Sequence, residues 1–392
     1  MSSSLSVSPS GVGSGLIVCT HLPPPVDGLA FASLRIIEAF NDARVPLSIF
    51  DISGDTRTAA YHFKDPVYHL KRVWRTCHAA LGILFSPREF KWVYMPVNSG
   101  AGAIYNLVLA AFARLRGKRI ILHHHSFRYV DSESSLIARL LRTCGDDAVQ
   151  IVLCGCMRRK LESLYGRMRL SYELPSDYYS TLRAEHALKL TSENGPVILG
   201  HLSNLTLEKG VDDCIALHRA LVARGDAVTL VIGGPCSSPA AKRVLDEAVA
   251  EFPQSLVYMG ALDEAAKEQF YRRINVFLFP TRYRNEADPI VVSDAQSYGL
   301  PTIVTDRGCL GERVDGSVGM VISQDENFVG TVLERIPSEL ALRDFARTCG
   351  PAAKMRHLSL RAKAIEEFSE LCALLDASES INYRFPQSQQ DK

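Results

Sequence analysis

No stretch of this sequence is apolar for long enough to cross a membrane. A bilayer span needs about 18 uninterrupted apolar residues, and every apolar run here is broken by polar or charged residues well before that length. The first run, residues 16–20, is also far shorter than the core of a secretory signal, and residues 1–15 supply no basic segment before it. We therefore expect a cytoplasmic protein, whose membrane contact, if it has one, is peripheral and on the inner face.

Two common nucleotide-binding signatures are missing as well. Neither G-x-G-x-x-G nor G-x-x-x-x-G-K-[ST] occurs anywhere in the chain. Their absence argues against a standard NAD site and against a P-loop kinase.

The ten cysteines are scattered, and only Cys154 and Cys156 lie close together in the sequence. A cysteine-based metal site would need a second pair at ligand spacing, and none accompanies them. In a long chain without a secretion signal we expect reduced thiols. We interpret the pair as part of a buried strand end, and we expect no metal site.

Length and composition predict two globular domains. The chain has 392 residues, of which 47% are hydrophobic and 22% charged, and a chain of this length divides into two domains more often than it forms one. The net charge of +1 conceals an asymmetry, because residues 1–180 contain 21 Lys and Arg against 14 Asp and Glu. This excess is typical of a surface that faces an anionic partner such as membrane lipid, although chance surface charge explains it equally well.

Short apolar segments alternate with helical segments in two series. The first series of expected strands covers residues 16–20, 47–50, 92–95, 119–124 and 150–154, and the second covers residues 197–199, 228–232, 256–259, 276–279, 302–304 and 320–322. Helices are expected at residues 31–41, 103–115, 134–142, 211–223, 240–251, 265–273 and 358–375. Apolar strands bounded by turns and separated by helices predict parallel sheets covered on both faces.

The fold class expected from this pattern is α/β, with two Rossmann-like doubly wound domains facing each other across a cleft. The expected boundaries are a tail at 1–15, a first domain at 16–185, a second at 195–352, a C-terminal helix at 353–384 that packs back on the first domain, and a tail at 385–392. In such sheets ligands bind beyond the carboxyl ends of the strands. Functional residues should therefore lie in loops that directly follow strands.

Two acids flank the start of a predicted helix in the second domain. Glu286 precedes it, Pro289 suits its first turn, and Asp294 lies inside it. At a rise of about 1.5 Å per residue the two carboxylates stand about 12 Å apart. That is too far for an acid/base pair or a shared metal, but it suits two anchors on one polyhydroxylated ligand. The alternative is a helix N-terminal charge and a solvated Asp.

A lysine–glycine pair and a double glycine follow the first two strands of the second domain. Lys209 and Gly210 stand at the mouth of a helix, where a cation beside helix N–H groups favours a diphosphate, although a surface lysine at a turn is the simpler interpretation. Gly233 and Gly234 predict a tight turn that lets the backbone approach a ligand closely.

In the first domain, two segments end expected strands with polar residues. The first is the Pro-rich loop that ends in Asp27 and Gly28, where backbone N–H groups could approach a phosphate. The second is the run of His123, His124 and His125, in which alternation puts the first and third on one face of the strand. No third ligand at a recognisable spacing follows, so we favour a polar active-site edge over a zinc site.

Taken together, these segments resemble the retaining nucleotide-sugar glycosyltransferases of the GT-B fold, in the large family four. The resemblance covers most of the chain and is strongest from residue 197 to residue 322. It identifies Glu286 and Asp294 with the family's E-x7-E motif, in which the first acid contacts the donor sugar and the second holds the ribose. It identifies Lys209 and Gly210 with the family's diphosphate-binding segment and His125 with the histidine near the transferring sugar.

The resemblance implies a hexosyltransferase that moves a sugar from a nucleotide-diphosphate sugar to a glycan, lipid-linked or other hydroxyl acceptor. Glu286, His125 and Lys209 are its expected catalytic residues, and Asp27 and Gly28 form an acceptor-side loop. No acidic motif is placed like the Asp-x-Asp metal site of other transferases, so neither a metal nor another cofactor is expected, and no nucleic acid. The expected donor-binding residues are Asp294, Asn204, Gly210, Gly233, Gly234, Ile290 and Val291.

Three positions depart from the family pattern. Asn204 stands where the family has an arginine on the diphosphate, Asp294 is one methylene shorter than glutamate, and Pro289 deletes an amide donor. Two alternatives therefore stay open. One is a nucleotide-sugar epimerase or hydrolase on the same fold, and the other is a non-catalytic homologue that binds a nucleotide sugar or a partner.

Overall fold

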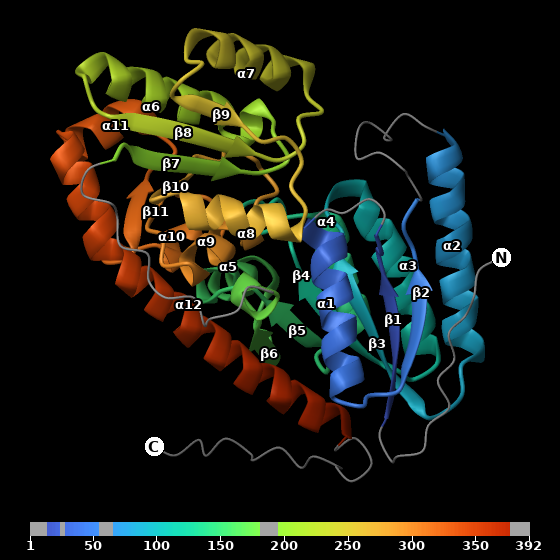
Figure 1. Cartoon of the computed structure of the whole chain (residues 1–392). Helices are drawn as coiled ribbons and strands as arrows, with labels where there is room; N and C mark the ends of the chain where they lie inside the picture. Colours follow the sequence, from blue (N-terminus) through green and yellow to red (C-terminus); the bar gives the residue numbers. More distant parts are fainter. Residues whose placement is uncertain (1–13, 24–27, 55–65, 181–194, 377–392) are drawn as a thin grey trace, which may run out of the picture.

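The chain folds into two parallel sheets of six strands each. The computed structural model describes residues 14–23, 28–54, 66–180 and 195–376. In the first sheet the strand order is β2-β1-β3-β4-β5-β6, and in the second it is β12-β11-β10-β7-β8-β9. Every paired strand in both sheets runs parallel to its neighbour, as the apolar runs predict, and Figure 1 shows the two halves side by side.

The first domain contains strands β1 (Gly15–Thr20), β2 (Leu47–Asp51), β3 (Phe90–Val97), β4 (Arg119–His124), β5 (Val149–Val152) and β6 (Leu170–Glu173). Its helices are α1 (Gly28–Asp42), α2 (Pro66–Phe85), α3 (Ala103–Leu115), α4 (Ser135–Cys144) and α5 (Gly155–Tyr165), with short 3₁₀ turns η1 (Gly100–Gly102) and η2 (Ser176–Tyr178).

The second domain contains strands β7 (Val197–Leu202), β8 (Val228–Gly233), β9 (Leu256–Tyr258), β10 (Val276–Phe279), β11 (Thr302–Thr305) and β12 (Gly319–Ile322). Its helices are α6 (Val211–Arg224), α7 (Pro239–Glu251), α8 (Glu264–Arg273), α9 (Ile290–Ser297), α10 (Leu310–Arg313) and α11 (Phe328–Arg335), with a 3₁₀ turn η3 (Leu207–Lys209). Helix α12 (Glu339–Asp376) closes the described chain.

Each sheet is buried on both faces because successive side chains along a strand point to opposite sides. In β1, Ile17 packs with α2, α3 and α4 on one face, while Leu16 and Val18 pack with α1 and the end of α12 on the other. The second sheet is sandwiched in the same way, by α6, α7 and α11 on one face and by α8, α9 and α10 on the other. Because helices cover both faces of each sheet, the strands have no exposed polar face.

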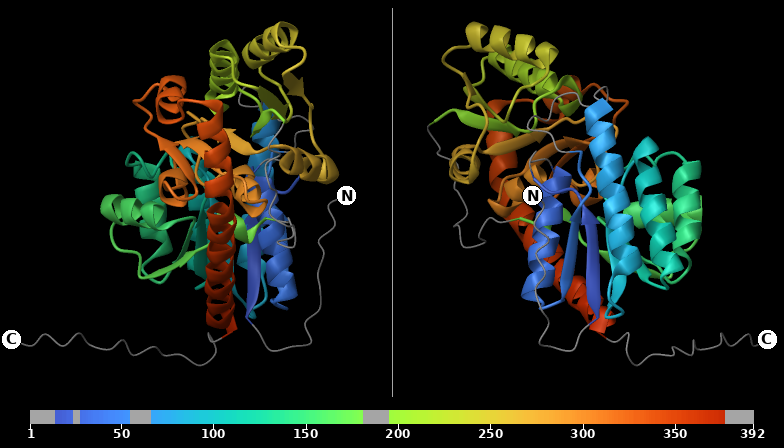
Figure 2. Two further views of the ribbon diagram at one scale, coloured as in Figure 1. Left: turned by 60° about the vertical axis from the view of Figure 1, so that its left-hand side comes forward. Right: turned by 90° about the vertical axis from the view of Figure 1, so that its right-hand side faces the viewer.

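Helix α12 joins the two domains. It begins against the second sheet, where Leu342 and Ala346 belong to the core, and its far end places Phe368, Leu371 and Leu375 in the core of the first sheet. Figures 1 and 2 show it running along one side of both halves. The sequence predicted a C-terminal helix from residue 353, with an amphipathic segment at 358–375. The helix instead begins at Glu339 and runs for 38 residues through Pro351, a residue type that usually interrupts a helix.

Strand β6 and the helices α5, α10 and α11 were not expected from the sequence. Strand β6 is half-buried along its whole length, so its apolar signal is weak. Within the described residues, no helix combines the length and the apolar character that crossing a bilayer requires.

Candidate functional site

The second sheet places two charged loops side by side. Its strand order reverses between β7 and β10, which are neighbours although strands β8 and β9 lie between them in the sequence. At such a reversal the loops after the two strands diverge to opposite faces and leave a crevice where ligands bind. Lys209 follows β7 and Glu286 follows β10, so both residues belong to the loops at this reversal.

Lys209 and Glu286 form an ion pair. The lysine Nζ lies 2.5 Å from a carboxylate oxygen, with 20% of the lysine side chain and 9% of the glutamate side chain exposed. The same carboxylate oxygen accepts a hydrogen bond of 3.1 Å from Thr281. The lysine Nζ also lies 4.5 Å from the centre of the Tyr283 ring, so one face of the ammonium meets an aromatic ring and another meets the acid.

The loop that carries Lys209 is fixed by its backbone. Thr206 caps the turn η3 by accepting from the Lys209 amide. Gly210 then has φ +83°, and a Cβ there would stand 2.2 Å from the Pro280 carbonyl oxygen. Only glycine permits both the left-handed conformation and this approach, and the approach brings the lysine loop against the exit of β10.

The other expected donor residues take different positions around this pair. Asn204 is exposed to solvent. The Gly234 amide already donates to Gly260 at 2.7 Å, so it is engaged within the protein. Ile290 and Val291 form the first turn of α9 directly after Pro289, which is the N-cap and not part of the first turn.

Asp294 lies on α9, away from the ion pair in its contacts. Its carboxylate accepts a hydrogen bond of 3.0 Å from Ser180, at the end of the first domain. Burial raises the pKa of Asp294 to about 7, and the hydrogen bond from Ser180 and the charge of Lys267 only partly offset that effect. The group therefore changes its charge near neutral pH.

The expected first-domain residues lie on the other sheet. The rings of His123 and His125 are 3.9 Å apart between centroids, as expected for residues on one face of a strand. His123 is buried and bonds to Tyr94 at 2.7 Å and to Tyr179 at 3.3 Å. Burial lowers the pKa of His125 to about 3, and the neighbouring His124 adds to the effect, so His125 is neutral at physiological pH. Gly28 begins α1, while Asp27 lies outside the described residues.

A buried charge cluster between the domains was not predicted. Arg313, from α10, bonds to Asp177 of the first domain at 2.6 Å and to Asp288 of the second at 2.7 Å, and all three side chains are at most 3% exposed. Burial would lower the pKa of the arginine, but the two carboxylates outweigh it and raise that pKa. Burial would likewise raise the pKa of Asp177, but Arg313 and His357 together outweigh it and lower that pKa.

Further hydrogen bonds extend this cluster, which we call the interdomain clamp. His357 of α12 lies 2.7 Å from the Asp177 carboxylate, and Ser293 of α9 donates to the same group at 3.0 Å. The Ser176 amide donates to Asp288 at 2.6 Å. The clamp thus ties η2, α9, α10 and α12 together. The adjacency of Asp288 to Glu286 was the only sequence signal that could have pointed to it.

The structure corrects one expectation about the cysteines. Cys154 is not a reduced core thiol, because it forms a disulfide with Cys309 across the two domains. The partners are 155 residues apart, so the sequence spacing gave no sign of the pairing.

Comparison with known sequences finds a family model that matches the second domain. Residues 196–336 match the model of the family described as glycosyl transferases group 1. Over 231 residues the chain is 27% identical to a protein of Bacillus subtilis (strain 168) named as a glycosyltransferase, EpsF, and the match covers 54% of this chain and 57% of that protein. Over 162 residues it is 25% identical to the capsular polysaccharide biosynthesis glycosyltransferase CapM of Staphylococcus aureus, covering 40% of each. The matches thus span about half the length of these relatives.

Solved structures of similar fold cover nearly the whole chain. Sucrose-phosphate synthase from Thermosynechococcus elongatus has a TM-score of 0.68 at 17% identity and covers 93% of this chain and 100% of its own. The lipopolysaccharide outer core galactosyltransferase WaaB has a TM-score of 0.63 at 14% identity, over 91% of this chain and 99% of its own. HepE from Anabaena, in complex with UDP, has a TM-score of 0.60 at 14% identity, over 91% and 99%. The two-domain α/β architecture is therefore the GT-B fold.

Proposed function

We propose that this protein is a glycosyltransferase that moves a sugar, retaining its anomeric configuration, from a nucleotide-diphosphate sugar to a hydroxyl acceptor. The observation that carries the proposal is the ion pair of Lys209 and Glu286 at the reversal point of the second sheet. It lies within the residues that match the group 1 model. Nucleotide sugars also bind proteins of this fold, since HepE was solved with UDP-glucose.

In the proposed reaction, the bond from the anomeric carbon to the diphosphate breaks while the acceptor oxygen bonds to the same face of that carbon. The proton of the acceptor hydroxyl passes to the leaving diphosphate. Lys209 and the first N–H groups of α9 stabilise the charge that builds on the diphosphate, which is electrostatic catalysis by groups already in place. When the donor binds, the Lys209 ammonium contacts a phosphate oxygen in addition to the Glu286 carboxylate.

Glu286 and His125 orient the sugar in this proposal. The carboxylate of Glu286 is held by Thr281 and Lys209, so it accepts hydrogen bonds from sugar hydroxyls without a large rearrangement. A neutral His125 approaches from the first domain and donates or accepts a hydrogen bond without adding charge. Asp294 accepts from the ribose hydroxyls in place of Ser180.

We also propose that the acceptor lies at a membrane surface, which the first domain contacts. A glycan or lipid-linked acceptor on the inner face of the membrane fits the positive charge of residues 1–180. It also fits the face of α2, where Leu70, Trp74 and Phe85 are 71%, 61% and 78% exposed. Flotation of the protein with anionic vesicles, compared with neutral ones, tests this contact.

The decisive experiment measures sugar transfer with and without an acceptor. Nucleoside diphosphates are first screened for thermal stabilisation, because a ligand of the native state raises its melting temperature. The donor so identified is incubated with the protein, and products are separated by mass spectrometry. We expect a glycosylated acceptor, at a rate that excess EDTA leaves unchanged.

Variants connect that activity to the site. We expect Glu286→Ala and Lys209→Ala each to reduce transfer by about 10²–10³-fold while the circular dichroism spectrum stays the same. Lys242→Ala serves as the matched control, because this lysine is exposed and pairs only locally with Asp246. Normal turnover in both site variants would contradict the assignment.

The same assay separates the two alternatives. An isomerised donor without acceptor would indicate an epimerase, and free sugar would indicate a hydrolase. Nucleotide binding without any turnover would indicate a non-catalytic homologue, for which the exposed Asn204 in place of an arginine is the best support.

A further inference from the structure

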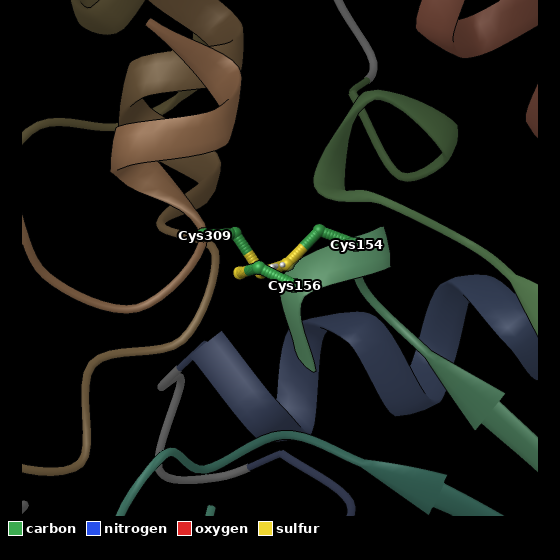
Figure 3. A group of neighbouring side chains, drawn as sticks. All are labelled: Cys154, Cys156 and Cys309. Atoms are coloured by element: carbon green, nitrogen blue, oxygen red, sulfur yellow. Dashed lines mark hydrogen bonds between the residues drawn. A yellow bond between two sulfur atoms is a disulfide. The ribbon is translucent and has the colours of Figure 1, made fainter. Parts of the chain in front are cut away.

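Three cysteine sulfurs meet where the two domains touch. The sulfurs of Cys154, Cys156 and Cys309 all lie within 4.8 Å of one another, and Figure 3 shows them between the first domain and the loop from the second. Cys154 and Cys309 are joined as a disulfide. Cys156 is a free thiol whose sulfur lies 3.2 Å from that of Cys154.

The disulfide ends in the loop between β11 and α10, which rests on the loop of Glu286. The Cys309 amide donates to the Ala287 carbonyl at 2.7 Å. Gly308 has φ +64°, and a Cβ there would stand 2.2 Å from the Ala287 oxygen and 2.8 Å from the Glu286 oxygen. A covalent bond at Cys309 therefore constrains the backbone next to the candidate sugar-binding acid.

Ion pairs and hydrogen bonds surround the disulfide on the same loop. Arg307 pairs with Asp131 of the first domain at 2.8 Å. The Glu312 carboxylate accepts from the amides of Gly155 and Cys156 at 3.1 and 2.6 Å, at the start of α5. None of these contacts involves the sulfur atoms of the disulfide, so they remain available to hold the two segments together when the bond is broken.

We propose that Cys154, Cys156 and Cys309 form a thiol–disulfide exchange site that reversibly joins the β11–α10 loop to the first domain. Its substrates are low-molecular-weight thiols and disulfides of the glutathione class. Half-buried Cys156 is the residue through which the exchange reaches solvent, since both disulfide partners are buried. A reversible bond also suits the reducing compartment expected from the sequence, where permanent disulfides are rare.

The first step of the exchange takes place within the protein, and glutathione is the reactant in the second. The Cys156 thiolate attacks the Cys154 sulfur, a Cys154–Cys156 bond forms, and the Cys309 sulfur leaves as a thiolate that takes up the proton lost by Cys156. Two molecules of reduced glutathione then convert the remaining disulfide to two thiols and become one oxidised glutathione. The reverse reaction, with oxidised glutathione as the two-electron oxidant, restores the tether.

The charge of Glu312 slows this exchange. Burial raises the pKa of Cys156 to about 11, the charges of Glu312 and Asp288 add to the effect, and Lys160 and Arg159 partly offset it. The amides that would stabilise a thiolate at a helix start are already bonded to the Glu312 carboxylate. Since the thiolate is the attacking form, exchange should accelerate as pH rises towards 11 and when the charge of Glu312 is removed.

The test uses the full chain in glutathione buffers that range from fully reduced to fully oxidised. Free thiols are trapped with an alkylating reagent, and the disulfides are mapped by mass spectrometry of peptides. We expect the Cys154–Cys309 bond to form in oxidised buffer and to disappear in reduced buffer, with a minor Cys154–Cys156 species between them. Hydrogen exchange of residues 306–313 should be several-fold slower in the oxidised protein.

Three variants sharpen this test. Cys156→Ser should keep the Cys154–Cys309 bond but lose and regain it several-fold more slowly, while Glu312→Gln should speed both reactions. Cys236→Ser removes a half-buried free thiol of the second domain and should change nothing. A Cys154–Cys309 bond that resists excess reduced glutathione, or one that Cys156→Ser leaves equally fast, would overturn the proposal. So would tight binding of one Zn²⁺ to the reduced protein that each of the three Cys→Ser changes abolishes.

A final measurement concerns the donor site and rests on the proposed function. Because the tether bears on the Glu286 loop, oxidised and reduced proteins should differ in the melting shift that a nucleoside diphosphate produces. If neither form binds the nucleotide while the peptide map still shows reversible exchange, the proposed function fails and the exchange site stands.

Discussion

Two ion pairs of nearly equal length, one within the second domain and one between the domains, differ in burial and in number of partners. Lys209 and Glu286 are 2.5 Å apart and remain partly exposed. Arg313 is 2.6 Å from Asp177 and 2.7 Å from Asp288, with almost no exposure. The arginine has four side-chain bonds to fixed acceptors, whereas the lysine has one acidic partner.

The difference separates a group that can change partners from one that cannot. A half-buried lysine that still reaches solvent exchanges a carboxylate for a phosphate at smaller cost, because water and ligand replace what it leaves. A buried guanidinium that leaves its carboxylates strands unpaired charges, which is strongly unfavourable. Distance alone therefore does not identify a functional ion pair.

The largest expected effect is on stability, in Arg313→Met. Removing the arginine leaves Asp177 and Asp288 buried without their cation, so we expect a loss of about 3–5 kcal/mol. Calorimetric melting measures it. The matched control is Arg335→Met, because that arginine is exposed and pairs with exposed Glu326, and it should cost less than about 1 kcal/mol. Equal losses in both would show that the clamp does not stabilise the protein.

The next effect is on transfer, in Lys209→Met. This variant should lose about 2.7–4 kcal/mol of transition-state stabilisation while its melting temperature changes far less than that of Arg313→Met. Steady-state kinetics and calorimetry on the same preparation measure the two quantities. A variant that melts early but transfers sugar at the wild-type rate would reverse the roles we assign to the two ion pairs.

Acid should weaken the clamp by a smaller amount. The pKa of Asp177 is lower in the folded protein than its ordinary value near 4, so its stabilisation is fully present above that value and is lost as the pH falls below it. One carboxylate of this kind contributes about 2 kcal/mol. Melting temperatures between pH 6 and pH 3 should therefore fall more steeply for the wild type than for Asp177→Asn, and parallel curves would argue against this carboxylate as the origin.

The smallest effect concerns Asp294, whose pKa of about 7 lies near physiological pH. The carboxylate is protonated below that pH and ionised above it, and the ionised form accepts hydrogen bonds from ribose hydroxyls more strongly. Affinity for a nucleoside diphosphate should rise several-fold from pH 6 to pH 8 in the wild type. Titration calorimetry should show a flat dependence for Asp294→Asn, and the same slope in both would remove Asp294 from the nucleotide site.

The sequence predicted the sheets because their signal is local. Strands β4 and β10 have the limits that their apolar runs indicated, and the loops after β7 and β10 contain the residues that the motif spacing singled out. Lys209 and Glu286 could be paired in advance, because parallel strands bring the loops at their carboxyl ends to one edge of the sheet.

The contacts between domains could not be predicted in this way. Arg313, Asp177 and His357 belong to three distant segments, and no local period or motif relates them. The same holds for Cys154 and Cys309, which looked like ordinary buried thiols because only tertiary structure brings them together. Helix α12 was underestimated because Pro351 counts against a helix locally, whereas packing against both sheets favours it.

Because α12 packs on both domains, the core of the first domain is complete only after the end of this helix has been synthesised. The core of the first domain contains Phe368, Leu371 and Leu375, which are translated long after the strands they cover. Domains generally fold as units while the chain emerges. Here the first domain lacks the end of α12, which covers one face of its sheet, until the second domain has been synthesised. A nascent chain arrested before residue 360 should therefore expose apolar surface over β1 and β3 and bind chaperones, even though every strand of both sheets has already been synthesised.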